Sequence, residues 1–201
     1  MPSEVLILFA HPAPQRSRVN RALRRAVADL GGVTFHDLYG AYPDFMIDVA
    51  YEQSLLRAHD VIILQHPFYW YSAPAILKEW QDLVLQHGFA YGAGGDALSG
   101  KSLMSAITTC GHEDSYAGTG MNRFAICDLL RPFEQTAQLC GMRWLPPFII
   151  HGTHIIEDAA IARSAEAYRE LIGALRNEGA NDAAFRPNGQ DRPTRLSEQG
   201  A

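Results

Sequence analysis

Short runs of consecutive apolar residues alternate along the chain with longer segments in which apolar residues recur every three or four positions. The runs are typical of strands buried on both faces, and the spaced pattern is typical of helices with one buried face. The expected strands span residues 5–11, 33–38, 61–66, 101–109 and 144–152, the last of them interrupted. The expected helices span residues 17–30, 51–60, 74–84, 123–140 and 158–175. This alternation predicts an α/β fold, with a parallel sheet covered by helices on both faces.

The length of 201 residues suits one domain with a sizeable core, which we place at residues 1–176. From residue 177 to residue 201 the chain turns polar, with Gly, Pro, Asn and Arg and little to bury. We therefore expect this last segment to be a flexible tail, or an arm used in assembly.

The composition narrows the class of protein. A formal net charge of -5 argues against nucleic acid or an anionic membrane as the main partner. No apolar run reaches the roughly 18 residues of a membrane span, and the start, MPSEVLILFAH, fits a first strand better than a signal peptide. Cys110, Cys127 and Cys140 lie far apart and outside any CxxC motif. We therefore expect reduced thiols in a cytoplasmic protein. We expect no metal site, because no Cys/His cluster has zinc spacing.

One motif is best rejected. GDALSGKS, residues 95–102, fits the GxxxxGK[ST] pattern of phosphate loops. A phosphate loop leaves a strand and enters a helix, so that free N–H groups and the helix dipole meet the phosphates. Here Lys101 enters an expected strand, so we interpret the segment as a glycine-rich turn.

Polar and aromatic residues follow three of the expected strands. In an open α/β sheet, ligands bind beyond the carboxyl ends of the strands, where the strand order reverses. The group after the first strand suits an anion, because it combines side-chain donors with the free N–H groups of a new helix. Its members are His11, Ser17, Arg18, Val19 and Asn20. Taken alone, Ser17 fits a simple helix cap better than an anion ligand.

The other two groups suit a planar ring. The third strand is followed by four consecutive aromatic residues, Phe68, Tyr69, Trp70 and Tyr71. The fourth is followed by small and polar residues, Thr108, Thr109, Cys110, Gly111 and His112, and then by Tyr116. An anion site, an aromatic wall and a polar loop along one sheet edge predict a flavin mononucleotide pocket. No GxGxxG follows the first strand, so a dinucleotide Rossmann site is not expected.

Several stretches carry a family resemblance. LFAHPAPQRSRVN, DLYGAYPDFMID, QHPFYWYSAPAILKEW, GFAYGAGGDALSGK and LRPFEQTAQLCGMRWLPPFII resemble the flavodoxin-like NAD(P)H:quinone oxidoreductases, and most of all the ancillary subunits of the Kef glutathione-gated potassium-efflux systems. The resemblance covers residues 4–175. It implies a flavodoxin-like three-layer sandwich whose five-stranded parallel sheet has the order 2-1-3-4-5, a homodimer with the active site near the interface, and bound FMN or FAD. It also implies two-electron reduction of quinones by NAD(P)H.

The resemblance assigns roles to individual residues. It places the phosphate on His11, Ser17, Arg18, Val19 and Asn20. The flavin ring is then held by two loops, Phe68, Tyr69, Trp70 and Tyr71 in one and Thr108, Thr109, Cys110 and Gly111 in the other. Cys110 departs from the family, which usually has glycine there. Tyr116 matches a tyrosine that shares a proton relay with a histidine in the larger relatives, but the histidine position is Asn122, so His112 would have to substitute.

These residues lead to a hypothesis of ping-pong hydride transfer, from NAD(P)H to flavin N5 and then to a quinone. Tyr116 would protonate the product, or would only form part of the pocket wall. Two alternatives stay open: a regulatory subunit of a potassium-efflux transporter, peripheral at the inner face of the cell membrane, and a domain whose pocket has lost its flavin. The short chain has no obvious room for an adenine, which favours FMN over FAD.

Overall fold

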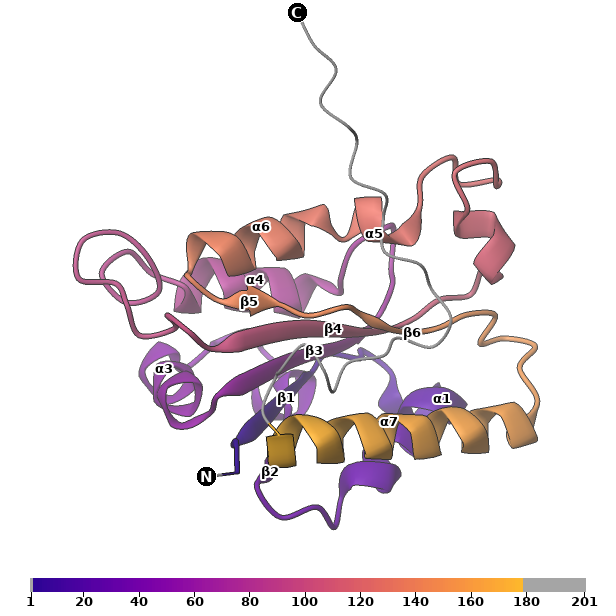
Figure 1. The fold of residues 1–201 in the computed structure, drawn as a ribbon, viewed down its shortest axis with the longest axis horizontal. Coiled ribbons are helices and arrows are strands. Elements are labelled where there is room, and N and C mark those ends of the chain that lie inside the picture. Colours follow the sequence, from indigo (N-terminus) through magenta and orange to yellow (C-terminus); the bar gives the residue numbers. More distant parts are fainter. Residues whose placement is uncertain (1, 179–201) are drawn as a thin grey trace, which may run out of the picture.

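A computed structural model describes residues 2–178, and its centre is a single parallel sheet (Figure 1). The strands are β1 (Val5–Phe9), β2 (Val33–Asp37), β3 (Val61–Pro67), β4 (Ser102–Thr108), β5 (Arg143–Trp144) and β6 (Phe148–Ile150). They lie in the order β2-β1-β3-β4-β5, and β6 pairs with the far end of β4. The expected strand order is therefore confirmed.

Helices cover the sheet on two sides and give three layers (Figure 1). They are α1 (Arg18–Val27), α2 (Leu38–Ala41), α3 (Val49–Ala58), α4 (Ala75–Val84), α5 (Ile126–Leu129), α6 (Arg131–Leu139) and α7 (Asp158–Glu178), with short 3-10 turns η1 (Pro14–Arg16) and η2 (Glu113–Tyr116). In β1, Leu6 and Leu8 pack into the core of α3, α4 and α6, and Val5 and Ile7 into the core of α1 and α7. Alternate side chains of one strand thus serve opposite layers, which explains the continuous apolar runs.

Three elements differ in detail from the expected pattern. The interrupted fifth strand is two short strands, β5 and β6, on either side of the Pro146–Pro147 pair. The single helix expected over residues 123–140 is broken at Leu130, and Pro132 lies in the first turn of α6, where its missing N–H is tolerated. Asp37 caps a short helix, α2, in a stretch for which no helix was expected. In each case a proline or a cap decides the local boundary.

The glycine-rich segment before β4 is a turn, as expected. Its Lys101 donates hydrogen bonds to the backbone carbonyl oxygens of Arg57 and His59, at 3.1 and 2.6 Å. Ser102 then begins β4 directly, so no helix N-terminus follows to receive a phosphate.

The domain boundary expected at residue 176 is not tested, because the predicted tail lies outside the described residues from 179 onward. Within residues 2–178, none of the helices has the length and apolar character required to cross a bilayer. The same part of the chain holds no group of three His, Cys, Asp or Glu side chains placed to bind a metal ion.

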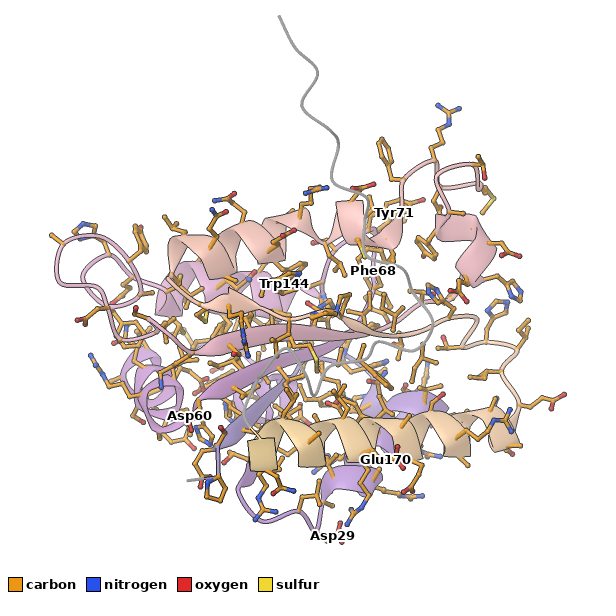
Figure 2. All side chains as sticks on the ribbon, in the orientation of Figure 1. Asp29, Asp60, Phe68, Tyr71, Trp144 and Glu170 are labelled. Atoms are coloured by element: carbon orange, nitrogen blue, oxygen red, sulfur yellow. The ribbon has the colours of Figure 1, made fainter. Side chains whose placement is uncertain are left out.

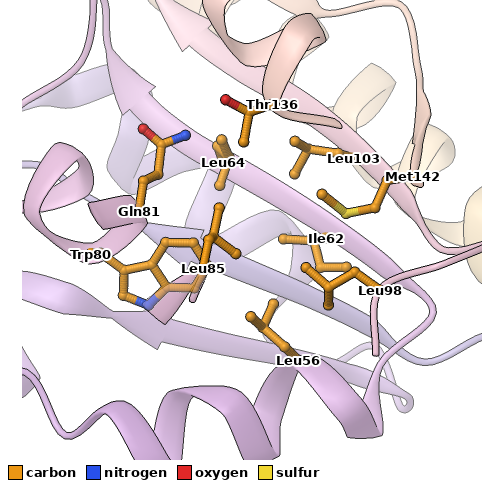
Figure 3. Close-up of a pocket in the computed structure, with 10 residues that line it drawn as sticks. All are labelled: Leu56, Ile62, Leu64, Trp80, Gln81, Leu85, Leu98, Leu103, Thr136 and Met142. Atoms are coloured by element: carbon orange, nitrogen blue, oxygen red, sulfur yellow. The ribbon is translucent and has the colours of Figure 1, made fainter. Parts of the chain in front are cut away.

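The two faces of the sheet pack against separate hydrophobic cores. Trp144 packs on the side of α6, and Glu170 lies on α7 in the opposite layer (Figure 2). An apolar cavity of about 10 Å³ remains between the sheet and the helix layer that contains α4 and α6, lined among others by Leu64, Trp80 and Met142 (Figure 3). It has about the volume of one water molecule, so no cofactor fits there.

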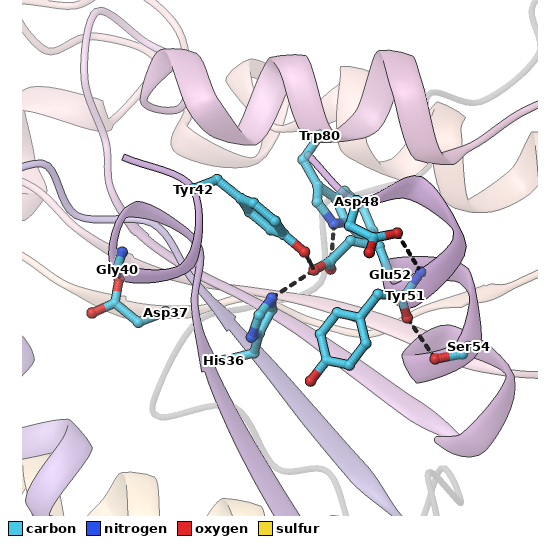
Figure 4. Close-up of polar contacts among 9 residues, drawn as sticks. All are labelled: His36, Asp37, Gly40, Tyr42, Asp48, Tyr51, Glu52, Ser54 and Trp80. Atoms are coloured by element: carbon cyan, nitrogen blue, oxygen red, sulfur yellow. Dashed lines mark hydrogen bonds and ion pairs between the residues drawn. The ribbon is translucent and has the colours of Figure 1, made fainter. Parts of the chain in front are cut away.

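A buried carboxylate connects four segments of this layer (Figure 4). Glu52 of α3 is fully buried and receives hydrogen bonds from the Tyr42 hydroxyl at 2.6 Å and from Trp80 Nε1 at 2.8 Å. Its Oε1 also lies 2.6 Å from His36 Nε2 of β2. Because Trp80 belongs to α4, this cluster fixes α4 against β2 and α3, and α4 begins where the aromatic loop ends.

Candidate functional site

A cleft of about 570 Å³ opens at the carboxyl ends of the strands. It lies within the range of cofactor sites, which is roughly 300–1,000 Å³. Segments that follow β1, β3, β4 and β6 contribute its lining: His11, Ala13, Arg16, Ser17, Arg18, Val19, Pro67, Phe68, Tyr69, Thr108, Cys110, Tyr116, Thr153 and His154. The cleft therefore brings together residues from all three groups that the sequence analysis selected.

The first turn of α1 forms one end of the cleft. Ser17 caps the helix, and its Oγ accepts hydrogen bonds from the backbone N–H of Asn20 at 3.2 Å and from Asn20 Nδ2 at 3.1 Å. Arg16 lines the cleft and pairs with no carboxylate in the part of the chain that the structure describes. Arg18 also lines the cleft, but its guanidinium binds Asp158 at the start of α7. Arg16 is therefore more available to an anion than Arg18 is.

His11 is a neutral donor at this end of the cleft. Burial lowers the pKa of its imidazole, although the nearby Asp37 acts in the opposite direction. Its Nδ1 accepts a hydrogen bond from the backbone N–H of Ala13 at 3.1 Å. The proton of the neutral ring is therefore on Nε2, which is free to donate.

The aromatic loop contains a tight, strained turn. Trp70 and Tyr71 have φ angles of 49° and 62°, and the backbone N–H of Ser72 donates to the carbonyl of Tyr69 at 3.0 Å. Two successive residues with positive φ normally call for glycine or asparagine, and large side chains there cost about 1–3 kcal/mol each. Strain of this kind is concentrated at functional sites.

The four aromatic residues of that loop separate into two pairs. Phe68 is buried and lines the cleft together with Tyr69, which is 42% exposed. Trp70 is 92% exposed and does not line the cleft. The Tyr71 hydroxyl donates to Asn122 Oδ1 at 3.2 Å, which joins this loop to the segment after η2. Figure 2 places Phe68 and Tyr71 at the end of the sheet near α5.

The loop after β4 packs closely around a glycine. Thr109 is buried behind the cleft, and its hydroxyl donates to the carbonyl of Gly111 at 2.8 Å. A Cβ on Gly111 would lie 3.1 Å from Cε2 of Tyr116, so a side chain there would push the tyrosine. Cys110 is exposed and lines the cleft, so its thiol occupies space that glycine would leave open.

Tyr116 ends η2, and its ring lies 6.0 Å from that of Phe68. Burial raises the pKa of its phenol, although a hydrogen bond with Thr109 acts in the opposite direction. The phenol therefore keeps its proton at neutral pH. His112, expected as a substitute partner, does not line the cleft, and its ring lies beside that of His154.

The structure brings a different histidine, His151, to Tyr116. The two rings are 5.6 Å apart, and His151 Nδ1 is 3.1 Å from the Thr109 hydroxyl. Burial lowers the pKa of His151, and its Nε2 is buried without a hydrogen-bond partner among the described residues. No role was predicted for His151 from the sequence. Its position directly after β6, at the same sheet edge, was the available signal.

Some residues that the sequence predicted for the site do not line the cleft, and some residues that line it were not predicted. Asn20 and Thr109 lie behind the cleft and not on its surface. Arg16, Thr153 and His154 were not selected, yet they line it. Thr153 reaches the cleft because its backbone N–H donates to the carbonyl of Thr109, a contact between distant segments that no local pattern reveals.

Comparisons with known proteins identify the family of this chain. A family model described as a flavodoxin-like fold matches residues 3–172. The chain belongs to the flavodoxin-like family. Among its relatives is the glutathione-regulated potassium-efflux system ancillary protein KefG of Pectobacterium atrosepticum, 50% identical over 173 residues that cover 86% of this chain and 94% of the relative.

Solved structures similar to this chain include one in complex with FMN and one named as a quinone reductase. General stress protein 14 of Treponema denticola, in complex with FMN, has a TM-score of 0.81 and 38% identity, covering 86% of this chain and 99% of that one. An NADPH-quinone reductase from P. pentosaceus has a TM-score of 0.77 and 36% identity, covering 83% and 96%. The resemblance stated from the sequence is confirmed at the level of family and close relatives.

Proposed function

We propose that this protein is an FMN-dependent NAD(P)H:quinone oxidoreductase. The observation that carries the proposal is one cleft in which anion donors from the start of α1 meet aromatic rings from the end of β3. The residues present fit FMN: the cleft has the volume of a cofactor site, and Gly111 leaves space that a Cβ would fill against Tyr116. The FMN complex of the Treponema relative supports the choice of cofactor, and FAD would require additional room for an adenine.

In this proposal different residues bind the phosphate and the ring of FMN. Ser17, Arg16 and the neutral His11 would receive the phosphate, together with the free N–H groups of α1. Phe68 and Tyr69 would wall the ring, and the loop after β4 would meet its polar edge. FMN held there would supply the chemistry for hydride transfer between NAD(P)H and a quinone.

Proton supply would fall to Tyr116. Its pKa is raised by burial, so the phenol carries a proton that it can donate to an oxygen atom gaining negative charge in the cleft. The hydrogen bond with Thr109 would orient the phenol, and His151, whose Nδ1 lies 3.1 Å from the Thr109 hydroxyl, would hold that hydroxyl in position.

A second candidate function is supported by the relatives at 50% identity, which are named as ancillary proteins of a potassium-efflux system. In this case the protein would dock on a transporter at the cytoplasmic face of the membrane, and its redox activity would be secondary. The exposed Trp70, on its strained turn, is available for such a contact or for a second copy of the chain in a homodimer.

Activity of the purified protein alone distinguishes the two functions. With FMN, NADH or NADPH, and a benzoquinone, we expect quinone reduction well above the rate given by free FMN, with no other protein present. A protein that binds FMN but gives only the free-FMN rate would contradict the reductase and leave the regulatory subunit. In sedimentation of the same sample we expect a dimer, and a monomer at micromolar concentration would contradict the dimeric site.

A further inference from the structure

A chain of buried hydrogen bonds runs from α7 through the sheet to the cleft. The Tyr168 hydroxyl donates to Gln65 Oε1 at 3.0 Å, and Gln65 Nε2 donates to Asn20 Oδ1 at 3.1 Å. Asn20 Nδ2 then donates to two hydroxyls, that of Ser17 at 3.1 Å and that of Thr108 at 3.2 Å. Tyr168 and Gln65 are 0% exposed and Asn20 is 1% exposed, so no water competes along the chain.

In each of these hydrogen bonds the donor lies on the α7 side and the acceptor lies on the cleft side. Tyr168 has one phenolic proton, and burial raises its pKa, so it stays a donor at all ordinary pH values. Gln65 must turn its oxygen to that proton, because a buried O–H without an acceptor is costly. Its NH₂ group is then directed at Asn20, whose oxygen is thereby occupied and whose NH₂ group points at the two hydroxyls.

The consequence lies at the two hydroxyls. Ser17 Oγ already accepts two hydrogen bonds, from the backbone N–H and the side chain of Asn20, and Thr108 Oγ1 accepts one. Among the described residues neither hydroxyl has an acceptor for its own proton, and both residues line the cleft. Both O–H groups are therefore directed at whatever occupies the cleft. If the side-chain amide of Asn20 were flipped, its oxygen would accept hydrogen bonds from the two hydroxyls, and their protons would then point away from the cleft.

We infer that Tyr168, Gln65 and Asn20 are positioning residues that set the Ser17 and Thr108 hydroxyls as donors to an anionic ligand group. Helix α7 thereby controls affinity for the phosphate end of the ligand, although Tyr168 does not line the cleft. The inference deepens the proposed function and rests on it for the identity of the ligand as FMN. It assigns Asn20 an indirect role in place of the direct phosphate contact that the sequence suggested, and it assigns the Thr108 hydroxyl to the phosphate and not to the flavin ring.

The test compares FMN with riboflavin, which has the same ring but no phosphate. Tyr168→Phe removes only the hydroxyl and keeps the ring that packs on Phe148. We expect about tenfold weaker FMN binding and less than about a twofold change for riboflavin. Tyr42→Phe is the matched control, because it removes another buried, hydrogen-bonded tyrosine hydroxyl in the opposite layer. It should change neither affinity, even if it lowers stability.

A double variant tests whether Tyr168 affects FMN binding through Ser17. On a Ser17→Ala background, Tyr168→Phe should weaken FMN binding much less than tenfold, because the two changes act on one chain of contacts. Equal losses for FMN and riboflavin in Tyr168→Phe, or an unchanged FMN affinity, would overturn the inference.

Failure of the proposed function would look different, since wild type would then bind no FMN. Inorganic phosphate decides the inference in that case. It should raise the thermal stability of wild type and of Tyr42→Phe, but not of Tyr168→Phe. No stabilisation of wild type, or equal stabilisation of all three proteins, would overturn the inference independently of flavin.

Discussion

Glu52→Ala is expected to lower the free energy of unfolding by about 3–5 kcal/mol, and the melting temperature by roughly 10 °C. The substitution leaves the Tyr42 hydroxyl, Trp80 Nε1 and His36 Nε2 in the interior without their common acceptor (Figure 4). It also leaves an unfilled volume beside α4. Thermal and urea unfolding, followed by circular dichroism, measure the loss.

Two further variants make this test specific. Glu79→Ala makes the same change at an exposed position of α4, and its stability should stay near that of wild type. Glu52→Gln keeps the size but turns an NH₂ group toward one of the three donors, so we expect an intermediate loss of about 1–3 kcal/mol. A Glu52→Ala protein as stable as Glu79→Ala would show that the cluster does not stabilise this layer.

Tyr116→Phe is expected to reduce quinone turnover about a hundredfold while FMN affinity changes less than about twofold. The phenol is the proton donor in the proposed reaction, and phenylalanine keeps its ring against Phe68 and His151. Because burial raises the pKa of Tyr116, wild-type turnover should not fall through loss of this proton below about pH 10. Steady-state kinetics from pH 6 to pH 9 measure both effects.

Tyr91→Phe is the control for the chemical change, since Tyr91 lies in the loop before β4, contacts His87 and does not line the cleft. It should leave turnover unchanged. Tyr116→Phe with wild-type turnover would remove the proton role and leave Tyr116 as part of the cleft wall. His151→Asn should give a smaller loss than Tyr116→Phe, because His151 contacts Thr109 and the Tyr116 ring but does not itself donate the proton.

The sheet was predictable because its signal is local. Apolar runs such as residues 61–66 face two helix layers at once, so each strand is visible without knowledge of its neighbours. The breaks near Leu130 and at Pro146–Pro147 were less predictable, since a proline can start a helix, end one or interrupt a strand.

The site was predictable only in outline. The positions of the strand ends predict which loops meet at the carboxyl edge of the sheet. They therefore predict the general position of Ser17, Phe68 and Tyr116. Which way each side chain points depends on contacts between distant segments. Asn20 and Thr108 lie 88 positions apart in the sequence but share a hydrogen bond. Contacts of this kind explain why the sequence predicted a ligand contact for Asn20, whereas the structure buries it behind the cleft. Similarly, the exposure of Trp70 follows from a turn with positive φ that its sequence does not suggest.

Alkylation of Cys110 in the presence and absence of FMN tests most directly that this cleft holds the flavin. Cys110 is exposed in the cleft, whereas Cys127 is partly buried elsewhere, and burial raises the pKa of the Cys127 thiol and slows its reaction. With FMN at ten times its dissociation constant, iodoacetamide should label Cys110 about tenfold more slowly, and Cys127 at its original rate, as measured by mass spectrometry. An unchanged rate at Cys110 under saturating FMN would contradict the assignment of this cleft.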